Sequence, residues 1–95
     1  MPEMRENDKT DPLTTLRKRL RFRSWHRGTR EMDMILGRFA DASLDGFDKK
    51  ELELYDRLLK NSDPDLYNWL SGAEPVPPAE DNCVMQEFIN FQFNG

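Results

Sequence analysis

The chain has 95 residues, of which 37% are hydrophobic and 34% charged, and its net charge is -4. A chain of this length forms one small domain and leaves little room for a deep, enclosed active site. Its single cysteine excludes an internal disulfide, and no apolar run approaches the roughly 20 residues of a membrane span. The first twelve residues lack the apolar core of a secretory signal. We therefore expect a cytoplasmic protein with no membrane insertion.

The N-terminal part predicts a flexible lead followed by a helix. Residues 1–11 show charge without hydrophobic periodicity, which is typical of a solvated end. Asp11 and Pro12 then fit the N-cap and first position of a helix that runs to residue 25 or 26. Gly28 suits the left-handed residue that follows a helix end. The leucines of this segment have helical spacing: Leu13, Leu16 and Leu20.

A second helix is predicted to begin near Thr29 or Arg30. Four apolar residues share one face of it: Met32, Ile35, Leu36 and Phe39. Glu31 and Asp33 fall in its first turn, where the helix dipole stabilises negative charge. Because they are two positions apart, they point in different directions and cannot share a proton as a catalytic pair.

The remaining segments also predict helices. Asp48 and Glu51 fit a capping box that opens a third helix. A short fourth helix is expected from Asp63 and Pro64 to a closing Gly72. Three prolines in 73–78 prevent a helix there, and apolar residues from Val84 to Ile89 predict a last one.

The fold class that follows is all-α, a small bundle of about five helices. We expect one helical domain over 12–90 and a flexible C-terminal end at 91–95. No segment shows the period-two alternation of a strand.

Charge is distributed unevenly along the chain. Residues 1–30 hold nine lysines and arginines against four carboxylates, a balance of +5, and the remainder holds five against fourteen, or -9. The basic first helix is either neutralised internally or awaits an acidic or phosphorylated partner. The run at 17–23, with Phe22 and Trp25 as stacking surfaces, leaves a nucleic-acid-binding or antitoxin-type regulatory protein as the alternative function. A solvated face that pairs with the acidic body is at least as well supported, and no nucleic acid is expected.

The sequence offers little for catalysis or cofactor binding. His26 is the only histidine, so a nucleophile with a base and an orienting group is not predicted. His26 and Cys83 match no zinc spacing, and the acidic residues form no calcium loop. The glycines form no phosphate-binding loop. We expect no catalytic residues, no metal and no tightly bound cofactor.

Four linked blocks nevertheless resemble a known family. They include "RGTRE" at 27–31 with an aspartate at 33, "ILGRFAD" at 35–41 and "YDRLLKNSDPDLYNWLSG" at 55–72. Over 16–72, in unbroken order, the chain is similar to the SdhE family, the FAD assembly factors of succinate dehydrogenase that carry an RGxxE motif.

The resemblance implies a five-helix assembly factor, or chaperone, that is not itself an enzyme. Such a protein binds the flavoprotein subunit of succinate dehydrogenase or fumarate reductase, and promotes covalent attachment of that client's FAD to a client histidine. The motif positions Arg27, Gly28 and Glu31 are then expected on the client-binding surface. Asp33 and Trp69 match further positions that the resemblance places near that surface.

Overall fold

The computed structural model describes residues 12–94, and within them five α-helices and no strand. The expected all-α bundle of about five helices is confirmed. The lead at 1–11, with the expected N-cap Asp11, lies outside the described residues. The helices are α2 (Pro12–Trp25), α3 (Arg30–Ser43), α4 (Lys49–Leu59), α5 (Asp63–Ser71) and α6 (Cys83–Asn94), with 3-10 turns η1 (Leu44–Gly46) and η2 (Pro78–Glu80).

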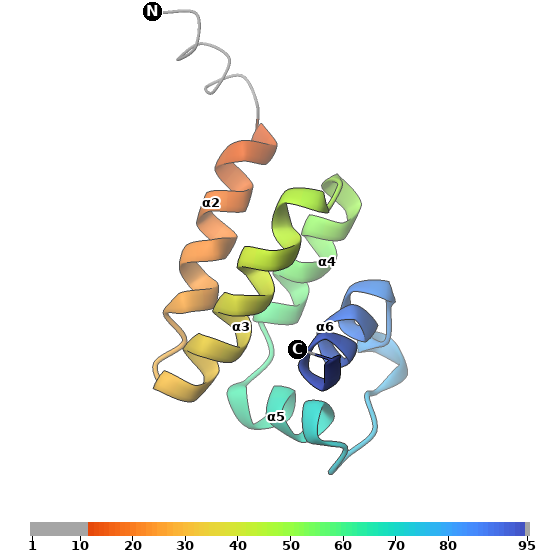
Figure 1. Cartoon of the computed structure of the whole chain (residues 1–95). Helices are drawn as coiled ribbons and strands as arrows, with labels where there is room; N and C mark the ends of the chain where they lie inside the picture. Colours follow the sequence, from red (N-terminus) through yellow and green to blue (C-terminus); the bar gives the residue numbers. More distant parts are fainter. Residues whose placement is uncertain (1–11, 95) are drawn as a thin grey trace, which may run out of the picture.

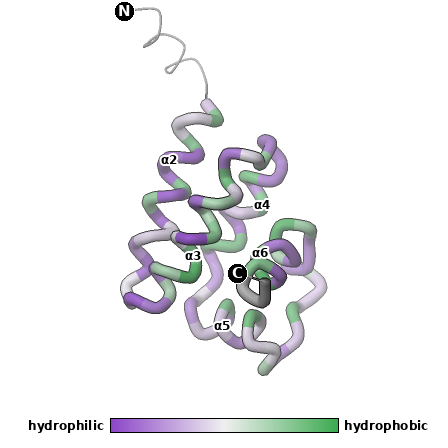
Figure 2. Tube along the Cα trace, in the orientation of Figure 1, coloured by the Kyte–Doolittle hydropathy of each residue, from purple (hydrophilic) through white to green (hydrophobic). Residues whose placement is uncertain are grey.

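The helices form two groups along the chain. In Figure 1, α2 and α3 run antiparallel as a hairpin with α4 behind them, and α5 and α6 lie toward the lower end of the view, where the α2–α3 loop also lies. Figure 2 shows hydrophilic and hydrophobic positions alternating every few residues along α3 and α4, as amphipathic helices require. The α2–α3 loop, residues 26–29, therefore lies at one end of the hairpin, near the start of α5.

Several helix ends follow the chemistry expected from sequence. Thr29 is the N-cap of α3, and its Oγ1 accepts from the Met32 N–H. Asp48 and Glu51 form both hydrogen bonds of the predicted capping box. Gly72 follows α5 in the left-handed conformation, with φ +82°. These local rules therefore placed the boundaries of α3, α4 and α5 closely.

The start of α5 agrees with the expectation, and one detail of the connector after it differs. α5 begins at Asp63 as expected, and its N-cap is Ser62, whose side chain accepts from the Asp65 N–H. The proline-rich connector at 73–78 is irregular as expected, but Pro78 starts the short turn η2. A proline at the first position of a turn loses no hydrogen bond, because that N–H has no acceptor there.

Phe39 is the centre of the hydrophobic core. Its ring lies 5.5–6.2 Å, centroid to centroid, from four other rings, which are Phe47, Tyr55, Phe88 and Phe91. Edge-to-face contacts of this kind stabilise beyond the area that they bury. Phe91 opens the segment that was expected to be a flexible end. The boundary expected at residue 90 therefore falls inside a continuous helix that reaches Asn94.

A buried polar contact joins α2 to α4. The hydroxyls of Ser24 and Tyr55 lie 2.6 Å apart, and Ser24 also donates to the Leu20 carbonyl. Both residues have no exposed surface. Burial raises the pKa of the Tyr55 phenol well above its usual range, so the phenol remains protonated and can act as the donor.

Replacing Tyr55 by phenylalanine is expected to lower the free energy of unfolding by about 1 kcal/mol, because the buried Ser24 oxygen loses a hydrogen-bond donor. Urea unfolding followed by circular dichroism measures the change. Tyr67→Phe is the matched control, since the Tyr67 ring is 45% exposed, and its stability should equal that of the unaltered protein. Equal stability of the two variants would show that the buried hydroxyl pair contributes nothing.

The basic first helix is neutralised internally in part. In α2, Arg21 and Arg23 pair with carboxylates and Arg17 donates to two backbone carbonyls, whereas Lys18 and Arg19 have no ion pair with any residue of the described range. Arg27, in the loop that follows α2, also pairs with a carboxylate. The pairs are Arg17 with the carbonyls of Leu44 and Phe47, Arg21 with Asp41 and Asp45, Arg23 with Asp56, and Arg27 with Asp63. Most of the basic run therefore fastens α2 to the acidic body.

Candidate partner-binding site

Gly28 has a backbone conformation that only glycine adopts readily. Its φ is +118°, beyond the left-handed helical region that other residues occasionally visit. A Cβ added at this position would meet no atom within 4 Å. The backbone therefore requires glycine for its conformation, and the space in front of it is open to the surface of another molecule.

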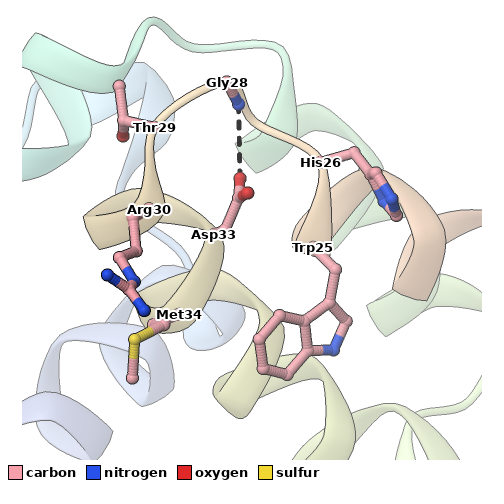
Figure 3. Close-up of a pocket in the computed structure, with 7 residues that line it drawn as sticks. All are labelled: Trp25, His26, Gly28, Thr29, Arg30, Asp33 and Met34. Carbon is pink, nitrogen blue, oxygen red and sulfur yellow. Dashed lines mark hydrogen bonds between the residues drawn. The ribbon is translucent and has the colours of Figure 1, made fainter.

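Asp33 fixes the loop that contains Gly28. Its Oδ1 accepts hydrogen bonds from the backbone N–H groups of Arg27 and Gly28, the second at 3.2 Å. Figure 3 shows this carboxylate pointing from α3 toward the Gly28 nitrogen. Asp33, predicted near the client surface, is half-buried and acts within the chain on the shape of the loop.

The Arg27 guanidinium points into the protein. Its Nε donates to Asp63 Oδ1 at 2.9 Å, and its two terminal nitrogens donate to the carbonyls of Leu59 and Asn61 at 2.6 and 2.7 Å. Only 12% of the side chain is exposed. The Leu59 carbonyl ends α4 and the Asn61 carbonyl lies just beyond it, where helix carbonyls lack intrahelical partners and a cation is favoured. Arg27 therefore fastens the α2–α3 loop to the junction of α4 and α5.

The other two predicted site residues differ sharply in exposure. Glu31 is exposed on the first turn of α3, and its carboxylate has no hydrogen bond or ion pair with a residue between 12 and 94. Trp69 is 8% exposed and belongs to the core. Of the five predicted residues, Gly28 and Glu31 are thus exposed, whereas Trp69 is buried in the core.

A first hollow of about 610 Å³ opens beside the loop, between the end of α2 and the start of α3. In Figure 3 the Trp25 ring forms one wall and the side chains of Arg30 and Met34 the other. A Cβ at Gly37 would lie 2.2 Å from the Trp25 ring, so the ring packs directly on the backbone of α3. The lining residues are Trp25, His26, Gly28, Thr29, Arg30, Asp33 and Met34.

A second hollow, of about 480 Å³, lies on the other side of the same loop. It is mostly apolar and is formed by the start of α3 and the start of α5. Thr29 lines both hollows and separates them. The lining residues are Thr29, Glu31, Met32, Asp63, Pro64 and Tyr67.

Large exposed hydrophobic side chains gather at this end of the molecule. Phe22, Met34 and Tyr67 are 62%, 46% and 45% exposed. Met34 lines the first hollow and Tyr67 the second, and Phe22 stacks on His26, another lining residue, with ring centroids 3.9 Å apart. Apolar groups that remain exposed together mark binding surfaces. None of the three is among the five predicted site residues, because the sequence does not show which apolar side chains remain exposed; it predicts Phe22 only as a stacking surface of the alternative function.

The described part of the chain offers neither a metal site nor a membrane span. No group of three or more metal-binding side chains occurs between residues 12 and 94. None of the helices in this range is both long and apolar enough to span a bilayer. Fold and site together define a small all-α protein whose α2–α3 loop is flanked by two open hollows with exposed apolar side chains.

The chain belongs to the family described as the flavinator of succinate dehydrogenase, whose model matches residues 18–92. The resemblance to FAD assembly factors seen in the sequence is thereby confirmed. The matched range contains every residue that lines the two hollows.

Similar proteins from other organisms support this family membership. The chain is 35% identical to the FAD assembly factor SdhE of Acetobacter pasteurianus over 83% of this chain and 72% of the relative. It is 35% identical to succinate dehydrogenase assembly factor 2, mitochondrial, of Drosophila grimshawi, over 84% of this chain and 56% of the relative. The Debaryomyces hansenii protein of the same name is 43% identical over 75% of this chain and 50% of the relative. The chain thus spans about half the length of these mitochondrial relatives.

Proposed function

We propose that this protein is an assembly factor that binds the flavoprotein subunit of succinate dehydrogenase and promotes covalent attachment of FAD to a histidine of that subunit. The flavoprotein subunit of the related fumarate reductase is a second client of the same kind. The compartment proposed is the cytoplasm, which stays a prediction because the relatives include mitochondrial assembly factors.

The observation that carries this proposal is the open space before Gly28, flanked by two hollows with exposed Met34 and Tyr67. The space admits a close backbone approach, and the hollows admit side chains of the partner. The surface lies within the range that matches the flavinator family. A protein of this kind fits a large partner better than a small substrate, because both hollows are open to solvent.

The proposed role is conformational and not catalytic. Docking would stabilise the client conformation in which FAD and the acceptor histidine are aligned, and the bond would form by chemistry of the flavin and client. FAD belongs to the client in this scheme, and we propose no tightly bound cofactor. Nucleic-acid binding is not favoured, because most of the basic run is engaged internally.

Covalent flavin incorporation tests the proposal. Purified apo flavoprotein subunit is incubated with FAD and a dicarboxylate, with and without this protein, then denatured and scanned for fluorescence at the subunit's band. The protein is expected to increase the fluorescence, and reactions that lack FAD set the background. No increase, with a subunit that a known assembly factor does flavinylate, would contradict the proposed function.

A further inference from the structure

The two hollows differ in the charge at their rims. Arg30 and Glu31 are consecutive in the sequence, so a turn of about 100° per residue sends their side chains to different sides of α3. Arg30 lines the hollow that contains Met34, and Glu31 lines the hollow that contains Tyr67. Thr29 separates the two, next to Gly28. The two sides of the α2–α3 loop therefore carry opposite charges, positive at Arg30 and negative at Glu31.

The first hollow has one unpaired cation at its rim, Arg30, and a second arginine, Arg38, lies farther along α3 without lining the hollow. Arg30, Met34 and Arg38 are four residues apart along α3 and form one row. Both arginines are exposed and have no ion pair within the described range. The Asp33 carboxylate also lines this hollow, near Gly28, and the two backbone N–H groups that its Oδ1 accepts do not cancel its negative charge, so the unpaired positive charge is at the Arg30 rim. His26 lies at the opposite rim from Arg30 (Figure 3).

The second hollow carries free negative charge. Glu31 is exposed without a partner among residues 12–94, and Asp63 is paired with Arg27. Asp65 is another exposed carboxylate on the first turn of α5, although it does not line this hollow. The half-exposed Tyr67 ring and Pro64 supply the apolar part.

We propose that the partner surface has the complementary polarity: an acidic side chain against Arg30 and Met34, and a basic side chain against Glu31 and Tyr67. The backbone between them crosses Gly28. This inference rests on the proposed function, which names the partner as the flavoprotein subunit. Charges at the rim of an interface set orientation and the rate of encounter, and like charges placed opposite each other weaken binding. The polarity therefore fixes the direction in which the client lies across the loop.

Exchanging the two charges tests the polarity without changing composition. The double variant Arg30→Glu, Glu31→Arg keeps the net charge and the charge of the first helical turn. The matched control is Lys50→Glu, Glu53→Lys on α4, where both side chains are exposed and neither has a hydrogen bond or ion pair within the described range. The Kd for apo flavoprotein subunit is measured by titration calorimetry, and circular dichroism and Tm check the fold of each variant.

The Arg30 and Glu31 exchange is expected to weaken binding about tenfold or more, and the α4 exchange by less than about twofold. If both exchanges bind as the unaltered protein does, the proposed polarity is wrong and the proposed function stands. Tighter binding by the first exchange would likewise overturn it, since the partner would then carry the opposite polarity. Failure of the unaltered protein to bind would instead overturn the proposed function and this inference together.

Discussion

Replacing Gly28 by arginine is expected to reduce covalent flavin incorporation to background while the protein keeps its helicity. The space before Gly28 is empty within this chain, so the new side chain would project where the client backbone is proposed to approach. The φ of +118° adds backbone strain of about 1–3 kcal/mol for any residue with a Cβ. Gel fluorescence of the client measures flavin incorporation, and far-UV circular dichroism measures helicity.

Two further variants distinguish two possible causes of lost activity, steric bulk at the interface and backbone strain in the loop. Gly72→Arg is the matched control, because Gly72 also has a positive φ, +82°, with open space around it, but follows α5 away from both hollows. It should keep flavin incorporation. Gly28→Ala shares the strain of Gly28→Arg with little of its bulk and should lose less activity. Normal incorporation by Gly28→Arg would remove this position from the interface.

The helices were predictable because their signals are local. Proline at the first position placed the start of α2, and the capping box of Asp48 and Glu51 placed the start of α4. Such signals need only the neighbouring residues, and they are satisfied in the same way in almost any fold. The continuation of α6 beyond residue 90 was not predictable, because it depends on the contact of Phe91 with Phe39, far away in sequence.

The candidate site was predictable only in part. The position of the loop and the need for glycine at residue 28 follow from sequence, but the direction of a charged side chain does not. Arg27 was expected to face the client, and its acceptors at 59, 61 and 63 became neighbours only when α4 and α5 packed on the hairpin. The sequence likewise did not show that Trp69 is buried and Met34 exposed, since large apolar side chains occur both in cores and on binding surfaces.

Because the Arg27 side chain is mostly buried, we expect its removal to lower the stability of the protein, which removal of a surface contact would not do. Arg27→Ala should lower the free energy of unfolding by about 2–4 kcal/mol, because it leaves two carbonyls of the α4–α5 junction and the Asp63 carboxylate without their donor. Urea unfolding measures this. Arg21→Ala is the control. Arg21 pairs with two aspartates, Asp41 and Asp45, whose side chains are 51% and 82% exposed, so this substitution should lower the free energy of unfolding by no more than about 1 kcal/mol.

A double-mutant cycle with Asp63→Ala completes the argument about Arg27. If Arg27 acts by fastening the loop to α5, the two substitutions share one interaction, and the stability of the double variant should exceed the additive expectation by about 1 kcal/mol. Client binding should then fall in parallel with stability, because the loop that presents Gly28 and Glu31 loses its anchor. An Arg27→Ala protein of normal stability that fails to bind the client would contradict this role and make Arg27 a direct contact.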